Sequence, residues 1–96
     1  MNTVDEQTIL HLLIEGHVQG VGFRYSTQQQ ASWLNLRGWV KNRNDGRVEL
    51  VAQGEPKNIN SFHAWCQSGP RFAHVTRCRQ LTPPDHVDLA AFEIER

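Results

Sequence analysis

Apolar residues recur along this chain with two different periods, and the two periods predict where strands and helices lie. Residues 8–15 are apolar on both sides of an alternating pattern, which predicts a central strand buried on two faces. Residues 47–53 are apolar at every second position, which predicts a strand with one exposed face. Further strands are predicted over residues 38–42, 74–81 and 91–95. We expect the last of these to point Phe92 and Ile94 inward.

Two other segments repeat apolar residues every three or four positions, which is the spacing of a helix face that packs on a sheet. Residues 23–34 place four such residues on one face, and Asn35 follows as a left-handed stop. A second helix begins at Gly54-Glu55-Pro56 and ends before Gly69-Pro70. The two predicted faces consist of Phe23, Thr27, Ala31 and Leu34, and of Ile59, Phe62 and Cys66.

The predicted element order is therefore β-α-β-β-α-β followed by a short C-terminal strand. Asn44-Asp45-Gly46 separates the second and third strands and predicts a tight hairpin there. Two helices on one face of an antiparallel sheet form an α+β sandwich of the ferredoxin-like kind. Because that fold hosts many unrelated activities, function has to be sought in particular residues.

Length and charge narrow the possible functions. The 96 residues predict a single domain over residues 1–96, with a polar N-terminal tail at residues 1–7. Ten lysines and arginines balance ten aspartates and glutamates, which argues against a nucleic-acid partner or an acidic membrane. No apolar run approaches the roughly 20 residues needed to cross a bilayer, and the N-terminus lacks a signal-peptide pattern. We expect a cytoplasmic protein with no membrane partner, and a monomer.

The cysteines and histidines do not predict a metal site. Cys66 and Cys78 form no Cys-x-x-Cys motif, and the five histidines show no ligand spacing. We expect the two cysteines to be free thiols in or near the core.

A glycine-rich turn before the first predicted helix is the most informative segment. Its residues are Gly16, His17, Val18, Gln19, Gly20, Val21 and Gly22. Its three glycines permit positive φ angles and inward-pointing N–H groups, which at a helix N-terminus form an anion site. The same glycines also fit a tight turn that binds nothing. The segment lacks the glycine and lysine patterns of ATP-binding and NAD-binding loops, so it predicts neither ligand.

Two polar residues near this turn stand where their local structure disfavours them. Arg24 falls in the first turn of the helix, where a cation costs about 0.3–1 kcal/mol unless an anion is bound nearby. Asn42 ends the second strand, which in this fold finishes at the same sheet edge as the first. Its amide would then face the turn and position a water. A surface arginine and an asparagine leading into the hairpin remain the alternatives.

The glycine turn, with Phe23-Arg24, resembles the phosphate loop of the acylphosphatase family, and the likeness covers nearly the whole chain after residue 8. The other matching segments are Gly38-Trp39-Val40-Lys41-Asn42, Asp45-Gly46-Arg47-Val48-Glu49, Gly54, Trp65, Gly69-Pro70 and Phe92-Glu93-Ile94. The resemblance implies a small free-standing hydrolase acting on an acid anhydride. It would cleave the carboxyl–phosphate bond of acyl phosphates into a carboxylate and inorganic phosphate, without metal or cofactor.

The resemblance also implies roles for individual residues. Residues 16–22 would bind the phosphate, Arg24 would hold its oxygens, and Asn42 would orient the attacking water. The chain departs from the family pattern at His17, where arginine is common, at Asn35, where glycine is usual, and at Arg43, where smaller or apolar residues are frequent. His17 would weaken the attraction of an anionic substrate, and Arg43 would alter access to the site.

Two other functions compete with this interpretation. A domain of the same family opens the much larger hydrogenase-maturation carbamoyltransferase, where it handles carbamoyl phosphate, but a 96-residue chain favours the free-standing enzyme. The second alternative is a non-enzymatic RNA-binding module of ferredoxin-like fold. That module needs exposed aromatic residues on central strands and a basic sheet face, and Glu49 and the neutral charge argue against it.

Overall fold

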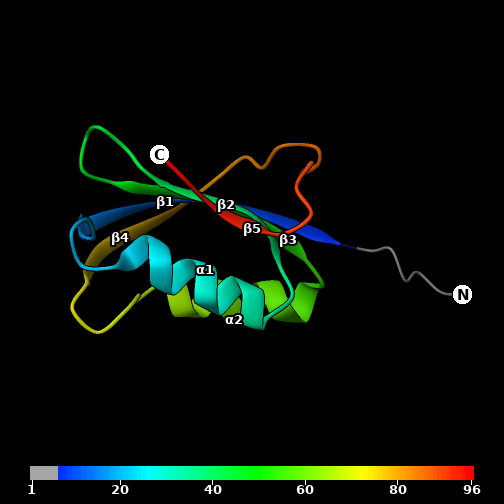
Figure 1. Cartoon of the computed structure of the whole chain (residues 1–96), viewed down its shortest axis with the longest axis horizontal. Coiled ribbons are helices and arrows are strands. Elements are labelled where there is room, and N and C mark those ends of the chain that lie inside the picture. Colours follow the sequence, from blue (N-terminus) through cyan, green and yellow to red (C-terminus); the bar gives the residue numbers. More distant parts are fainter. Residues whose placement is uncertain (1–6) are drawn as a thin grey trace, which may run out of the picture.

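The computed structural model describes residues 7–96, so most of the predicted N-terminal tail lies outside the described residues. The described residues form two helices and five strands in the predicted order (Figure 1). These elements are β1 (Thr8–His17), α1 (Phe23–Trp33), β2 (Arg37–Asn42), β3 (Val48–Gly54), α2 (Pro56–Cys66), β4 (His74–Leu81) and β5 (Phe92–Glu95).

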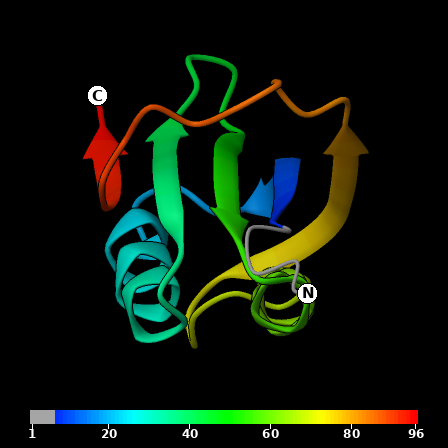
Figure 2. The ribbon, with the colours of Figure 1, turned by 90° about the vertical axis from the view of Figure 1, so that its right-hand side faces the viewer.

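The five strands form one sheet in the order β4-β1-β3-β2-β5. The first four are antiparallel to their neighbours, and β5 is added parallel to β2, a pairing that the sequence pattern did not predict. Both helices cover one face, whereas the segment between β4 and β5 crosses the opposite face (Figure 2). The ferredoxin-like α+β prediction is confirmed. Because β1 and β2 are each antiparallel to β3, they run in the same direction and end at one edge.

The hydrophobic core lies between the sheet and the two helices. β1 is buried on both faces, as its apolar pattern predicted: Leu12 and Ile14 have no exposed surface, and Leu13 on the other face is only 6% exposed. The stripe on α1 is buried apart from its last residue, Leu34, and the stripe on α2 is buried throughout. Asn35 ends α1 with a φ of 58°, which confirms the left-handed stop.

Apart from small shifts at other element ends, two further features differ from the predicted pattern. β1 continues to His17, two residues beyond the predicted end, because Gly16 and His17 still pair with β4 after a bulge at Glu15/Gly16. Ile94 was expected to point into the core but is 37% exposed. It belongs to the short edge strand β5, where it lines an open pocket.

The two cysteines are free thiols, as expected. Cys66 is buried in the core and Cys78 packs against the core's margin. Burial raises the pKa of both thiols. A raised pKa keeps a thiol protonated at neutral pH and makes it a poor nucleophile, so we assign these residues to packing.

Candidate active site

A pocket of about 320 Å³ lies at the sheet edge where β1 and β2 end. It is lined by Val18, Gly20, Gly22, Phe23, Arg24, Tyr25, Asn42, Ile94 and Arg96. The fold thus brings Arg24 and Asn42 together with three residues of the glycine turn. This is the juxtaposition expected from strands that end at the same edge.

The glycine turn enters α1 through backbone conformations that other residues rarely adopt. Gly20 and Gly22 both have a φ of 77°, and Gly22 is the N-cap residue of the helix. Gly22 has no side chain to cap the helix, and the first turn, which lies wholly within the described residues, contains no acidic residue. The N–H groups of that turn therefore keep their capacity to donate to an anion, with the helix dipole oriented to favour it.

Arg24 lies in this first turn with its side chain half-buried at the pocket. Among residues 7–96 its guanidinium forms no ion pair and no hydrogen bond. A cation here opposes the helix dipole, and no carboxylate of the described residues compensates it. The guanidinium is therefore available to a bound anion, which it can hold with two parallel hydrogen bonds.

Asn42, which also lines this pocket, carries a second unsatisfied group. Its side-chain oxygen, Oδ1, is buried and has no hydrogen-bond partner within the described part of the chain. Leaving a buried acceptor unpaired costs about 1–3 kcal/mol. Such an atom in a native fold calls for a ligand or a water that supplies the missing donor.

The remaining residues of the predicted loop do not line the pocket. Gly16 lies within β1, opposite β4, where a side chain would collide with the backbone oxygen of His74. His17 is exposed at the end of the same strand, and Val21 packs against the core. Gln19 directs its side-chain amide to the β2–β3 hairpin. Phosphate binding by the backbone of residues 16–22 therefore stays a prediction.

The hairpin beside the pocket carries a network of ion pairs. Arg43 contacts Asp45 at 3.1 Å and Glu49 at 3.0 Å, and Arg47 contacts Asp45 at 2.6 Å and Glu15 at 3.4 Å. The charge of Arg43 is therefore compensated inside the hairpin. The sequence alone could have indicated the pair with Glu49, since the antiparallel register places Glu49 opposite Lys41, next to Arg43.

These contacts lower the pKa of two carboxyl groups. Hydrogen bonds from the side chain and the backbone N–H of Arg47 hold the pKa of Asp45 well below its usual range. Partial burial raises the pKa of Glu49, but hydrogen bonds from His11 and Arg43 outweigh it and leave that pKa lowered. Both groups therefore favour the folded state most when they are ionised.

The lowered pKa values of Asp45 and Glu49 predict that the fold loses stability in acid. A carboxyl whose pKa is lower when folded stabilises the protein above its unfolded-state pKa, about 4, and loses that effect as the pH falls toward the folded value. We expect the melting temperature to fall as the pH decreases below about 4. Asp45→Asn should melt at a lower temperature than wild type at pH 7 and show a shallower decline in acid. Thermal unfolding followed by circular dichroism at pH 7, 4 and 2 measures both. Asp85→Asn, at an exposed position outside the hairpin, serves as the control, and an Asp45→Asn profile parallel to wild type would contradict the prediction.

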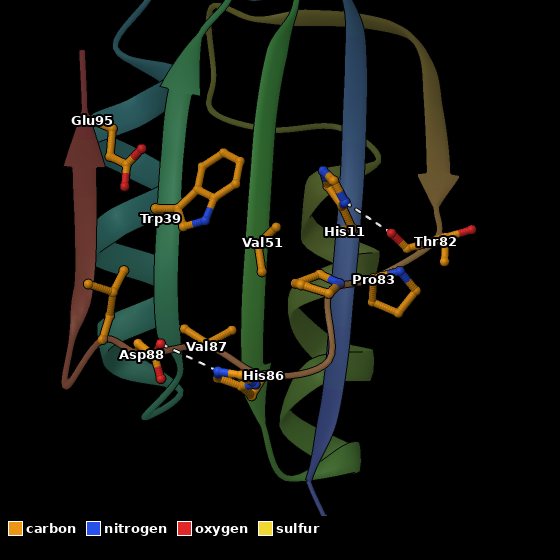
Figure 3. A pocket seen from close by; sticks show the side chains of 11 residues that line it. His11, Trp39, Val51, Thr82, Pro83, His86, Val87, Asp88 and Glu95 are labelled. Atoms are coloured by element: carbon orange, nitrogen blue, oxygen red, sulfur yellow. Dashed lines mark hydrogen bonds and ion pairs between the residues drawn. The ribbon is translucent and has the colours of Figure 1, made fainter.

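A second cavity, of about 520 Å³, lies on the face of the sheet opposite the helices, here called the open face. It is covered by the segment that joins β4 to β5 (Figure 3). His11, Val51 and Trp39 form its floor as one row across three strands. Both ring nitrogens of His11 are engaged, one by Glu49 at 2.7 Å and the other by the carbonyl of Thr82 at 3.2 Å. The lining holds no arginine, lysine or glycine. Although it is the larger cavity, it offers far less to a phosphate than the pocket of Arg24.

Residues 7–96 contain no group of three or more His, Cys, Asp or Glu side chains placed to hold a metal ion. Neither of the two described helices is long and apolar enough to span a membrane.

Comparisons with known proteins found a matching family model and several similar proteins. The acylphosphatase family model matches residues 10–94. An acylphosphatase from Vibrio cholerae serotype O1 is 43% identical over 89 residues, which is 93% of this chain and 98% of that protein. The crystal structure of an acylphosphatase from Bacillus subtilis superimposes with a TM-score of 0.86 at 37% identity, covering 95% of this chain and all of that one. HypF from T. kodakarensis is also similar, with a TM-score of 0.77 and 31% identity, but the match covers only 12% of its chain.

Proposed function

The chain belongs to the acylphosphatase family, and from this premise we propose that its Arg24–Asn42 pocket hydrolyses the carboxyl–phosphate bond of acyl phosphates. The products are a carboxylate and inorganic phosphate. One observation carries the assignment to this pocket. An arginine and a buried amide oxygen, both without partners among the described residues, meet at a glycine turn that opens a helix.

The phosphoryl group is bound by the N-terminus of α1. Backbone N–H groups of the glycine turn donate to its oxygens, and the helix dipole favours its negative charge. The guanidinium of Arg24 donates two further hydrogen bonds and neutralises charge that grows on those oxygens during the reaction. His17, which stands where arginine is common in the family, is exposed and does not line the pocket.

Asn42 supplies the nucleophile's orientation. Its Oδ1 accepts a hydrogen bond from a water and directs a lone pair of that water at phosphorus. The new bond joins the water oxygen to phosphorus, while the phosphorus–oxygen bond to the acyl group breaks and leaves its electron pair on the carboxylate. One proton of the water stays on the oxygen that is now bonded to phosphorus, and the other passes to another oxygen of the product phosphate or to solvent. Because a carboxylate is a good leaving group, no general acid is required.

Groups of the kind proposed for this site can lower the activation free energy by as much as enzymes typically do. Holding water and substrate in line contributes up to about 7–11 kcal/mol. Fixed donors that stabilise developing charge contribute a further 2.7–4 kcal/mol or so for each donor. Together these cover the range of about 8–23 kcal/mol by which enzymes lower activation barriers.

We further propose that the chain acts as one domain and as a monomer in the cytoplasm, without a nucleic-acid partner. The neutral net charge supports the last point. On the open sheet face, the central strands β1 and β3 present His11, Glu49 and Val51 rather than the aromatic pair of an RNA-binding sheet. The carbamoyl phosphate alternative is disfavoured because the chain is 43% identical to the acylphosphatase from Vibrio cholerae and 37% identical to that from Bacillus subtilis, against 31% identity to HypF from T. kodakarensis.

Steady-state hydrolysis of benzoyl phosphate by the purified protein tests this proposal. We expect rapid release of inorganic phosphate at an unchanged rate in EDTA, competitive inhibition by phosphate, and slower turnover of carbamoyl phosphate. A protein that is folded by circular dichroism and turns over neither substrate would refute the proposed activity. Turnover of carbamoyl phosphate alone would establish the alternative.

A further inference from the structure

The side chain of Gln19 joins the glycine turn to the hairpin that follows Asn42. Its amide nitrogen, Nε2, donates to the carbonyl oxygen of Arg43 at 2.8 Å and to that of Arg47 at 2.9 Å. Both contacts are partly buried and span 24 and 28 residues of sequence. An amide nitrogen has two hydrogens, so this one is fully satisfied. If the amide were rotated by half a turn, its oxygen would face two carbonyl oxygens, so the contacts define its orientation.

The two carbonyls belong to Arg43 and Arg47, the pair of residues next to Asn42 in the β2–β3 hairpin. Asn42 pairs with Val48 in the last register position of the β2–β3 ladder. The next pair is Arg43 and Arg47, closed by a hydrogen bond of 2.8 Å from the N–H of Arg43 to the carbonyl of Arg47. Gln19 binds both residues of this closing pair. Its amide thus holds the end of β2 immediately after Asn42.

Gln19 itself belongs to the glycine turn, residues 16–22, which is the proposed phosphate-binding loop. Gln19 stands between Val18 and Gly20, both of which line the pocket. The ion pairs of the hairpin join its residues to one another and to Glu15 and His11 of β1, which precede the loop. Among the described residues of the loop, Gln19 is the one whose side chain forms hydrogen bonds with the hairpin.

We propose that Gln19 is a positioning residue that fixes the distance between the bound phosphoryl group and the water held by Asn42. The inference rests on the proposed function, because it concerns the alignment of the same two groups. Attack in line tolerates little error, and a displacement of about 1 Å can cost about a hundredfold in rate. Without the two hydrogen bonds of Gln19, the loop still binds phosphate, but the position of Asn42 relative to the bound phosphoryl group is no longer fixed.

A double-mutant cycle tests this role, using Gln19→Ala, Asn42→Ala and the two combined. We expect Gln19→Ala to lower kcat for benzoyl phosphate by about 10- to 100-fold, while the inhibition constant of inorganic phosphate changes by less than about threefold. In the Asn42→Ala background the same substitution should change kcat by less than about twofold, because the group it positions is absent. Gln28→Ala is the matched control, since it removes a comparable amide-to-carbonyl bond, from Gln28 to Phe92 at 3.0 Å, and should keep wild-type kcat.

Each other outcome has a definite meaning. An equal loss of kcat in both backgrounds, or a loss of phosphate affinity that matches the loss of kcat, overturns the positioning role. A wild type without turnover, or an Asn42→Ala variant with wild-type kcat, refutes the proposed function instead. If Gln19→Ala does not fold, Gln19→Met provides the same cycle, because it keeps a similar side-chain length and removes both donors without adding a charge beside the phosphate.

Discussion

Replacing Arg24 with alanine is expected to lower kcat/KM for benzoyl phosphate by at least about a thousandfold, the lower range for an arginine that stabilises a transferred phosphoryl group. The guanidinium lies at the pocket with no partner among residues 7–96. Its removal takes away charge that attracts the substrate and charge that stabilises the transition state. Substrate affinity and turnover should therefore fall together. Steady-state kinetics, with the inhibition constant of phosphate measured in parallel, give both quantities.

Two further variants separate charge from geometry at this position. Arg24→Lys keeps a positive charge but loses the planar, two-bond grip, so it should recover phosphate affinity more than turnover. Arg37→Ala, at the start of β2 and therefore at the opposite end of the strand from Asn42, should keep wild-type kinetics. An Arg24→Ala variant that binds phosphate as tightly as wild type would show that the phosphoryl group lies elsewhere.

Replacing Asn42 with alanine is expected to lower kcat by about 100- to 1,000-fold, the effect of losing one preorganised hydrogen-bonding group. The inhibition constant of phosphate should change by less than about threefold, since in the proposed mechanism the glycine turn and Arg24 hold the phosphoryl group. The free energy of unfolding should stay level or rise by up to about 1 kcal/mol, because the substitution removes a buried oxygen without a described partner. Kinetics and urea unfolding measure the two effects on the same preparation.

The combination of slower catalysis and unreduced stability distinguishes a functional asparagine from a structural one. Sites that hold unsatisfied groups for a ligand commonly lower stability in the free protein. A loss of stability of about 2 kcal/mol or more would place the Asn42 amide among the groups that hold the fold together. A loss of phosphate affinity equal to that of Arg24→Ala would refute the division of labour between the two residues.

The sequence predicts the architecture well because the buried faces are periodic. The stripes Phe23–Thr27–Ala31 and Ile59–Phe62–Cys66 are buried where a period of 3.6 places them, and β1 is central because both of its faces are apolar. The meeting of Arg24 and Asn42 also follows from the topology, since strands one and two of this fold end at one edge. Local pattern and connection rules suffice for these features.

Other features depend on contacts that no pattern marks. Gln19 binds backbone carbonyls, which every residue has, so its partners emerge only from the path of the glycine turn. Ile94 alternates correctly with Phe92, but its exposure depends on its place in an edge strand beside an open pocket. The parallel addition of β5 to β2 also depends on a long irregular segment that crosses the sheet.

The position of β3 between β1 and β2 also determines when during folding the pocket comes into existence. β3 follows both strands in the sequence, and only its simultaneous pairing with each places the glycine turn beside Asn42. No single hairpin or helix contains the pocket, so a partly folded chain has no active fragment of it. Such non-local pairing slows folding, because the entropy of closing long loops is lost before the strand contacts that offset it have formed. Regained hydrolysis should therefore report completion of the whole sheet rather than the first appearance of helices.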